Sequence, residues 1–371
     1  MASFGVSFSP PPYPYERLDA LRKSAASFHG GAVDCSIGSP VDPPPSFLRE
    51  ELARAHGARG YPSSAGSLEY RSAAARWLNR RFQVDVGEMD VAACVGTKEF
   101  VASLAGYAHL RLPERDVVLY PSVSYPTYAM SAALCGLRAV PVTVTNGRLD
   151  LDAVAPSDVS RALVLWSNSP SNPTGHLDDL AAAADWGRRH GVLVASDECY
   201  VDFTWAAPPR SILQRGATGV LAVHSVSKRS NLAGVRAGFY AGDPSWVSYL
   251  RSVRQHAGLM VAGPVQALVA RAYDDDEHVG LQRERYWSRL QLMSDALAAC
   301  GVDAPLPDGA FYLWASKDGL DGWSLASWLA ERAGVVVSPG EFYGEGRDKV
   351  RIAVVAADGD LERVAQRLRT L

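Results

Sequence analysis

The sequence is poor in cysteine, and it has neither a long apolar run nor an excess of positive charge. Its five cysteines are scattered, odd in number and without the spacing of metal ligands, which favours reduced thiols over a disulfide framework or a zinc site. A net charge of −3 provides no basic surface for nucleic acid. No apolar run approaches the roughly 18 residues of a membrane span.

The first residues, 1–6, lack a basic stretch followed by an apolar core, so the sequence predicts no secretory signal peptide. Hydrophobic residues make up 47% and charged residues 21% of the 371 positions, which is typical of a water-soluble globular protein with room for two domains. We therefore expect a cytoplasmic protein without nucleic-acid or membrane partners. No internal repeat or low-complexity tract is visible.

Short apolar runs alternate with helical patterns through the central part of the chain. Runs that predict buried strands cover residues 91–95, 117–120, 162–166, 192–196, 220–223 and 238–241. Such alternation is typical of an α/β fold in which helices wrap a mostly parallel sheet. Before and between these runs we expect an arm at 1–15, a short strand at 33–38 and helices at 15–28, 46–56, 68–82 and 97–110.

The last third of the chain has a different pattern. Helices are predicted at 265–273, 277–300, 324–332 and 361–371, and strands at 311–314, 335–339 and 350–355. This combination predicts a compact α+β unit. We expect residues 1–45 to form the arm and part of this small domain, 46–275 a large domain that holds a cofactor, and 276–371 the rest of the small domain.

Polar residues stand where the predicted parallel strands end. Tyr125, Asn172, Asp197 and Lys228 each follow one of four successive strands. Ligands bind outside the carboxyl ends of the strands in sheets of this kind. The sequence therefore predicts that these side chains face one site.

Lys228 lies in a loop rich in serine and asparagine. Such a lysine can form a Schiff base with an aldehyde cofactor, while Ser225 and Arg236, eight residues after the lysine, hold the cofactor's phosphate. A surface lysine on a polar loop is the simpler interpretation of Ser-x-x-Lys alone. The rest of the chain favours the cofactor.

Two glycine turns are further candidates for anion contact. Gly96 leads into a helix whose first N–H groups, with Thr97 and Lys98, would bind phosphate, although most such junctions are plain helix caps. Gly38 is either a turn residue or a place where a substrate carboxylate approaches the backbone.

Asp197 has three interpretations. It is a loop carboxylate, or part of a metal site with Glu198 and His190, or the partner of a pyridinium nitrogen. The metal site is the weakest, because no further cluster of ligands lies nearby in the sequence. Asn172 is either a turn residue or an amide donor to a phenolate oxygen, which Tyr200 could share.

The order Asn-Pro-Thr-Gly at 172–175, Asp-x-x-Tyr at 197–200 and Ser-x-Ser-Lys at 225–228, with Arg236 beyond, resembles the pyridoxal-phosphate aminotransferases of fold type I, class I/II. The resemblance extends from Gly38 to Arg351. It implies a homodimer with shared active sites and transfer of an amino group between amino and keto acids.

The resemblance also implies roles for individual residues. Lys228 would carry the cofactor and move the proton, Asp197 would pair with the pyridine nitrogen, and Asn172 and Tyr200 would hold the phenolate oxygen. Arg351 and Gly38 would bind the substrate carboxylate. Phosphate would be held by Gly96, Thr97, Lys98, Ser225 and Arg236, with Tyr61 reaching in from the other subunit. No metal is implied.

One position departs from the family. Many relatives have an aromatic residue near Val123 to stack on the cofactor ring, and here the residue is aliphatic. We therefore assign the stacking to Tyr125, as in relatives with the sequence Tyr-Pro-x-Tyr.

Longer strings at 38–43, 168–175, 227–234, 254–258 and 339–344 are similar to actinobacterial succinyldiaminopimelate aminotransferases. This similarity implies glutamate as donor and N-succinyl-2-amino-6-ketopimelate as acceptor, in lysine biosynthesis. A distal anion would then need a partner, and Arg254 and Arg229 are candidates unless they are surface charges.

Three alternatives remain. The chain could be an aminotransferase of another amino acid or of a natural-product pathway, or a C–S lyase of the same fold. It could also bind the cofactor without turnover, as the sensor half of a transcriptional regulator does. The sequence has no helix-turn-helix extension to support this third alternative.

Overall fold

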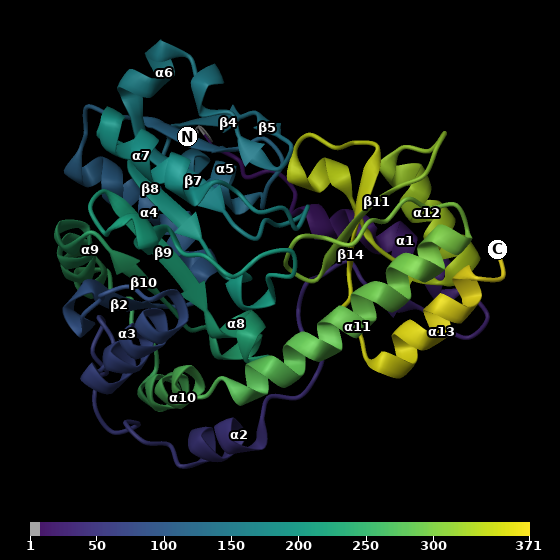
Figure 1. Ribbon diagram of the computed structural model, residues 1–371, viewed down its shortest axis with the longest axis horizontal. Helices are drawn as coiled ribbons and strands as arrows, with labels where there is room; N and C mark the ends of the chain where they lie inside the picture. Colours follow the sequence, from purple (N-terminus) through teal and green to yellow (C-terminus); the bar gives the residue numbers. More distant parts are fainter. Residues whose placement is uncertain (1–7) are drawn as a thin grey trace, which may run out of the picture.

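The computed structural model describes residues 8–371. Residues 1–7, which include the stretch tested for a signal peptide and the start of the predicted arm, lie outside the described residues. The chain forms a larger part around a seven-stranded sheet and a smaller part around a three-stranded sheet (Figure 1). No helix of residues 8–371 has the length and apolar character to cross a membrane.

The large sheet has the strand order β2-β10-β9-β8-β7-β3-β4. Its strands are β2 (Val91–Cys94), β3 (Val117–Pro121), β4 (Arg138–Val142), β7 (Ala162–Asn168), β8 (Leu193–Asp197), β9 (Val220–Ser225) and β10 (Gly238–Gly242). All pairs are parallel except those of β10, which runs antiparallel to β9 and to β2. The predicted α/β fold with a mostly parallel sheet is confirmed.

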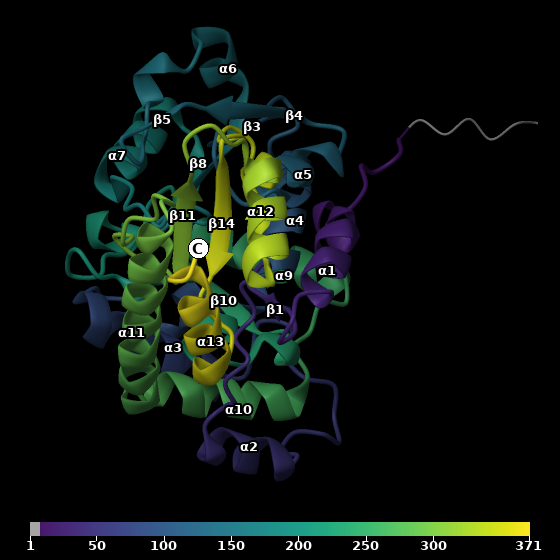
Figure 2. The ribbon, with the colours of Figure 1, turned by 90° about the vertical axis from the view of Figure 1, so that its right-hand side faces the viewer.

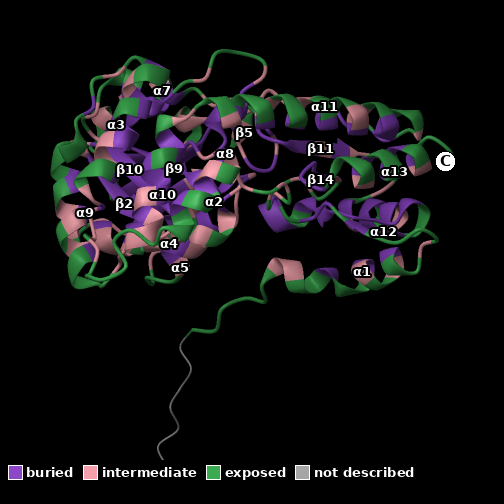
Figure 3. Cartoon of the chain, turned by 90° about the horizontal axis from the view of Figure 1, so that it is seen from below, coloured by how far each residue is buried: buried purple, intermediate pink, exposed green. Residues whose placement is uncertain are grey.

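Helices cover both faces of the large sheet. One face packs on α3 (Leu68–Phe82), α7 (Leu180–His190) and α10 (Gly263–Asp274), and the other on α4 (Thr97–Arg111), α5 (Thr127–Ala133) and α9 (Pro244–His256). Between them the inner strands are buried, β7 and β9 at every residue (Figure 3), whereas the edge strand β4 is partly exposed. This double cover explains why the strands are continuous apolar runs and not alternating ones.

The smaller part contains the sheet β11-β14-β13, from Tyr312–Ser316, Lys349–Ala353 and Ser338–Pro339. The helices α1 (Asp19–Ala26), α11 (Glu277–Ala299), α12 (Gly322–Ala333) and α13 (Asp358–Leu368) share its hydrophobic core (Figure 2). The strand predicted at 33–38 is shorter, since β1 (Val33–Asp34) pairs only with β12 (Val335–Val336). The helix predicted at 15–28 begins as a 3₁₀ turn at Pro14–Leu18.

The long helix α11 extends from the larger into the smaller part (Figure 1). The remaining elements are α2 (Ser46–Ala53), the hairpin β5 (Val144–Thr145) and β6 (Arg148–Leu149), α6 (Pro156–Arg161) and the short α8 (Val226–Arg229). The core of the smaller part includes Tyr200 and Phe203, so the two parts share apolar contacts. The domain limits at 45/46 and 275/276 stay a prediction.

Candidate active site

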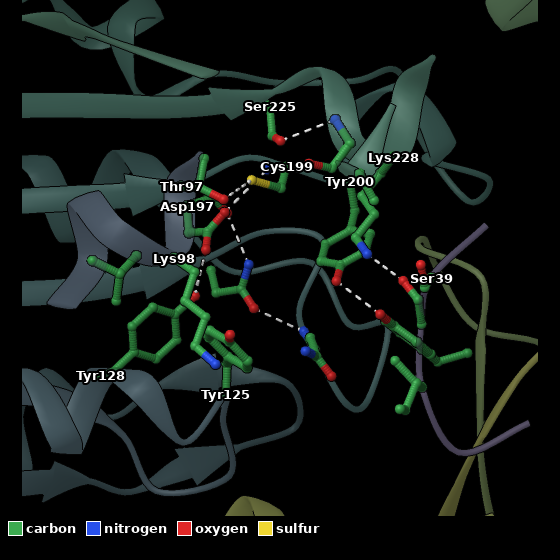
Figure 4. Close-up of a pocket in the computed structure, with 18 of the residues that line it drawn as sticks. Ser39, Thr97, Lys98, Tyr125, Tyr128, Asp197, Cys199, Tyr200, Ser225 and Lys228 are labelled. Carbon is green, nitrogen blue, oxygen red and sulfur yellow. Dashed lines mark hydrogen bonds between the residues drawn. The ribbon is translucent and has the colours of Figure 1, made fainter. Parts of the chain in front are cut away.

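A cavity of about 240 Å³ lies at the carboxyl ends of β7, β8 and β9. Eleven of the residues predicted from the sequence line it: Gly38, Thr97, Lys98, Tyr125, Asn172, Asp197, Tyr200, Ser225, Lys228, Arg236 and Arg351. Figure 4 shows Lys228 and Tyr200 on one side of it and Lys98 and Tyr125 on the other. Gly96 and Tyr61 do not line it.

Lys228 lies on α8, the single helical turn after β9. The turn starts at Ser225, whose Oγ accepts a hydrogen bond from the Ser227 N–H at 3.0 Å. The Lys228 amine donates to the carbonyl oxygen of Gly38, from the amino-terminal segment. Burial is the main cause that lowers the pKa of Lys228 to about 8, with Arg351 and Arg236 adding to it. A deprotonated amine is therefore accessible near neutral pH.

This pKa predicts a pH-dependent stability. Between pH 8 and 10.5 the folded chain has lost the Lys228 proton while the unfolded chain retains it, so the unfolded state binds more protons and stability rises with pH. We expect the cofactor-free wild type to gain roughly 2–3 kcal/mol relative to Lys228→Met across this window. Urea unfolding of both proteins at each pH measures it. An equal stability difference at all pH values would contradict the burial of the amine.

Asp197 ends β8 and is almost completely buried. It accepts hydrogen bonds from the Tyr128 hydroxyl at 2.9 Å and from the Cys199 N–H at 3.2 Å. Burial raises the pKa of this carboxyl group, although these donors oppose the shift. Tyr128 is the second tyrosine of the Tyr-Pro-x-Tyr string, but the string alone does not predict its contact with Asp197. A buried carboxylate of this kind gains from a cationic partner such as a protonated ring nitrogen.

Another part of the cavity presents hydrogen-bond donors to an anion. Thr97 begins α4 after Gly96, and Ser225 and Arg236 line the cavity beside it. Gly96 has a φ of +76°, which favours glycine, and a Cβ here would stand 2.3 Å from Nη2 of Arg236 and displace that guanidinium. N–H groups at a helix start, a hydroxyl and a guanidinium are the donors that a phosphate requires.

Arg351, on β14, is buried and belongs to the smaller part of the chain. It donates to Asn172 Oδ1 at 2.8 Å and to the Ser36 carbonyl at 2.6 Å. The rings of Tyr312 and Tyr343 lie 4.3 and 4.9 Å from its guanidinium carbon. Among residues 8–371 no aspartate or glutamate forms an ion pair with it.

Three tyrosines of this region, Tyr15, Tyr312 and Tyr343, carry no signal in the sequence. The Tyr200 hydroxyl lies 2.8 Å from that of Tyr312, and the Tyr15 hydroxyl lies 3.2 Å from that of Tyr343. A Cβ on Gly38 would stand 2.1 Å from the Tyr312 hydroxyl, which gives the glycine a steric reason. These tyrosines come from distant segments, so only the fold brings them together.

Two predicted partners of a distal anion are wrong. Arg254 is buried and pairs with Glu99, its Nη2 lying 2.6 Å from the carboxylate. Arg229 is buried as well and pairs with Asp202 at 3.1 Å. Neither lines the cavity, and neither is a surface charge.

The metal interpretation of Asp197 finds no support in the geometry. His190 ends α7, ahead of the first residue of β8, whereas Asp197 ends the same strand. The strand therefore separates the two side chains. Among the residues that the structure describes, no three His, Cys, Asp or Glu side chains form a cluster that could hold a metal ion.

Tyr125 lines the cavity and lies with its ring centroid 5.9 Å from that of Tyr128. Val123 forms a β-bridge with Gly344 and stays outside the cavity lining. The assignment of ring stacking to Tyr125 stays a prediction. Tyr61 is 99% exposed and cannot reach the cavity of its own chain.

The residues present fit pyridoxal phosphate. The anion site, the buried Asp197, the amide of Asn172 and the amine of Lys228 provide a partner for each polar group of that cofactor. A mostly parallel sheet with a lysine, an aspartate and these donors at its strand ends defines a transferase of fold type I.

Comparisons with known proteins agree with this fold class. The family model "Aminotransferase class I and II" matches residues 32–368. The chain is 42% identical to a probable aminotransferase, Rv1178, of Mycobacterium tuberculosis, covering 97% of this chain and 85% of that protein. It is 40% identical to the 4-dedimethylamino-4-oxo-anhydrotetracycline transaminase OxyQ of Streptomyces rimosus, with 96% and 99% covered.

Among solved structures, a probable N-succinyldiaminopimelate aminotransferase from Thermus thermophilus is 31% identical, with a TM-score of 0.85 and coverage of 96% of this chain and 100% of that one. The chain belongs to the class I and II aminotransferases. It is a pyridoxal-phosphate-dependent aminotransferase. The enzyme class and the cofactor predicted from the sequence are thus confirmed.

Proposed function

We propose that this aminotransferase exchanges an amino group between glutamate and N-succinyl-2-amino-6-ketopimelate. The observation that carries the proposal is the buried Arg351 guanidinium, which has no carboxylate partner among the described residues. A buried charge without a counterion is costly, so this position is built for an anionic ligand. The planar group can hold an α-carboxylate through two parallel hydrogen bonds.

When bound, pyridoxal phosphate supplies an aldehyde that takes up the amino group and a ring that delocalises the electron pair left at the substrate α-carbon. The chain's own residues would orient the cofactor and the substrate and would hold or move the protons. Asp197, oriented by Tyr128, holds a proton on the ring nitrogen. Lys228 moves the proton at the α-carbon, for which a pKa of about 8 is well placed.

Asn172 and Tyr200 would hold the phenolate oxygen. Because the Asn172 carbonyl oxygen accepts from Arg351, its NH₂ group is left as a donor to the cofactor. The amide therefore links the cofactor to the substrate carboxylate site. Such a link fixes the position of the substrate relative to the cofactor.

The distal anion of the acceptor needs a further cation. Four basic residues line the cavity, and three have roles above: Lys228, Arg236 and Arg351. The fourth, Lys98, is exposed, and its amine donates to the Tyr13 hydroxyl at 3.1 Å. We assign Lys98 to the distal succinyl or pimelate carboxylate in place of the phosphate. The similarity to the probable N-succinyldiaminopimelate aminotransferase of Thermus thermophilus supports this substrate class.

An aminotransferase of natural-product biosynthesis is the second candidate. The similarity to the tetracycline-pathway transaminase OxyQ favours it. So does the aromatic and apolar side of the cavity, formed by Tyr13, Tyr15 and Ile37, of which Ile37 is 46% exposed. A bulky acceptor without a distal charge would use these contacts and not Lys98.

A substrate panel separates these candidates. With glutamate as donor, we expect N-succinyl and N-acetyl dicarboxylic keto acids to be converted with higher kcat/KM than aromatic or small keto acids. Lys98→Met should lower kcat/KM for the dicarboxylic acceptors by roughly twofold to fivefold, since one exposed ion pair, worth up to about 1 kcal/mol, is lost. The exposed Lys23, changed to Met, is the matched control.

Two outcomes of the substrate panel would contradict the proposed substrate. A preference for aromatic or polycyclic ketones with no effect of Lys98→Met would favour the second candidate. Failure of glutamate to convert the bound cofactor to pyridoxamine phosphate, together with release of a thiol from cystathionine, would favour a C–S lyase.

We also propose a homodimer with shared active sites. Tyr61 stands on the loop between α2 and α3 and is fully exposed, as a residue that contacts the cofactor of a second chain would be in an isolated subunit. Leu52 and Leu68, at either end of this region, are exposed as well. Sedimentation of the loaded enzyme as a monomer would contradict this part of the proposal.

A further inference from the structure

The three residues after Lys228 all bond to one region, the junction of α10 and α11. Arg229 Nη2 donates to Asp276 Oδ1 at 3.2 Å, and the Ser230 hydroxyl lies 2.9 Å from His278 Nε2. Asn231 Nδ2 donates to Gln282 Oε1 at 3.2 Å. The turn that carries the lysine is therefore tied at three successive positions to the start of α11.

Arg229 anchors the turn from behind. Its guanidinium carbon packs against the rings of Trp77 and Tyr273, 5.4 and 4.8 Å from their centroids, and the guanidinium pairs with Asp202. Removing so buried a charge would leave its partner unpaired and would destabilise the whole protein. A test of the connection therefore needs another residue.

Ser230, His278 and Asp275 form a chain of side chains. His278 Nδ1 contacts Asp275 Oδ1, and burial, together with Arg229, lowers the pKa of His278. The ring is then neutral near pH 7, with its proton on Nδ1 toward the carboxylate and Nε2 accepting from the serine. The order resembles a hydrolytic triad, but Ser230 is 1% exposed, so no substrate reaches it.

The same helix continues into the smaller part. Gln282 Nε2 donates to Asp42 Oδ2 at 2.9 Å, and Arg289 pairs with Asp42 at 2.7 Å. Thus α11 holds both the segment that leads from Gly38 and the turn that follows Lys228. The Gly38 carbonyl in turn accepts from the Lys228 amine.

We propose that His278 is a positioning residue for Lys228, acting through Ser230 so that the docking of α11 sets where the lysine amine stands. This proposal rests on the proposed role of Lys228. The ionisable groups with the largest effect on the Lys228 amine are Cys199, Arg351, Arg236 and Asp197. None of these four lies on α11, so a change at His278, which contacts Ser230, reaches the amine through the turn.

The test compares His278→Ala, Ser230→Ala and the double variant as complete chains. In cofactor-free protein, each single variant should speed amide hydrogen exchange in residues 226–232 by about tenfold, because one buried hydrogen bond is lost. In loaded protein, both should shift the pH midpoint of the visible absorbance band in the same direction. The double variant should add nothing, because both changes break the same contact.

Two further variants serve as controls. His278→Gln keeps a hydrogen-bond acceptor, the side-chain amide oxygen, near the place of Nε2 and should restore most of the exchange protection, whereas the exposed His29→Asn should change nothing. Unchanged exchange in both single variants, or additive effects in the double variant, would overturn the proposal.

The proposed role of Lys228 is checked separately in the same series. Borohydride reduction of the loaded wild type, followed by mass spectrometry, should place the cofactor on residue 228. Absence of this label would remove the role of Lys228 itself. If residue 228 carries the label but amide hydrogen exchange is unchanged in the variants, only the proposed role of His278 is refuted.

Discussion

Replacing Lys228 by alanine is expected to lower kcat for transamination by about 10⁴-fold, since the change removes the proton carrier as well as the attachment point of the cofactor. The amine donates a hydrogen bond to the Gly38 carbonyl oxygen within the cavity. Stopped-flow absorbance with glutamate measures the rate of the first half-reaction. The loaded variant should also lose the visible absorbance of the wild type.

The matched control is Lys23→Ala, an exposed lysine on α1. It should leave kcat and the absorbance unchanged. A Lys228→Ala protein that turned over within tenfold of wild type would refute the assignment of the whole site, because the other lysine that lines the cavity, Lys98, stands on its opposite side.

Replacing Arg351 by leucine is expected to lower kcat/KM for glutamate by about 10³-fold, as loss of a buried, bidentate charge pair costs about 4 kcal/mol. Arg351→Lys should recover only part of this, because an ammonium cannot reproduce the planar fork. Steady-state kinetics with glutamate and with an amine that lacks a carboxylate separate loss of carboxylate binding from loss of the chemical step. The kcat/KM for the amine should fall far less than that for glutamate.

Arg332→Leu, which changes an exposed arginine on α12, is the control for charge alone. Equal losses for glutamate and for the carboxylate-free amine would mean that Arg351 supports the fold through Asn172 and Ser36 and does not bind substrate. Thermal unfolding of the cofactor-free variants tests that alternative directly.

The sheet and most of its helices could be predicted because their signals are local. Strands buried on both faces are continuous apolar runs, and β7, β8 and β9 were found within a few residues of their limits. The edge strand β4 was missed, since it contains Pro141 and is partly exposed. Short strands such as β1 depend on a distant partner, which no local pattern reveals.

The residues of the candidate site also divide into those with a local signal in the sequence and those without one. Lys228, Asp197 and Asn172 follow strand ends and could be predicted from position and residue type. Tyr128 and Tyr312 could not be assigned, because tyrosines are common in cores and their contacts depend on tertiary packing. The roles offered for Arg229 and Arg254 failed because a charged residue gives no sign in the sequence of whether it is paired inside the fold.

The cavity has four basic side chains and a single carboxylate among its lining residues. Small inorganic anions such as sulfate and phosphate will therefore compete with the amino donor, with the acceptor and with reloading of the cofactor. Buffers made from large organic zwitterions, kept at one ionic strength, are the appropriate medium for kinetic work. Constants measured in phosphate-buffered saline would understate the affinity of this enzyme for every dicarboxylic compound.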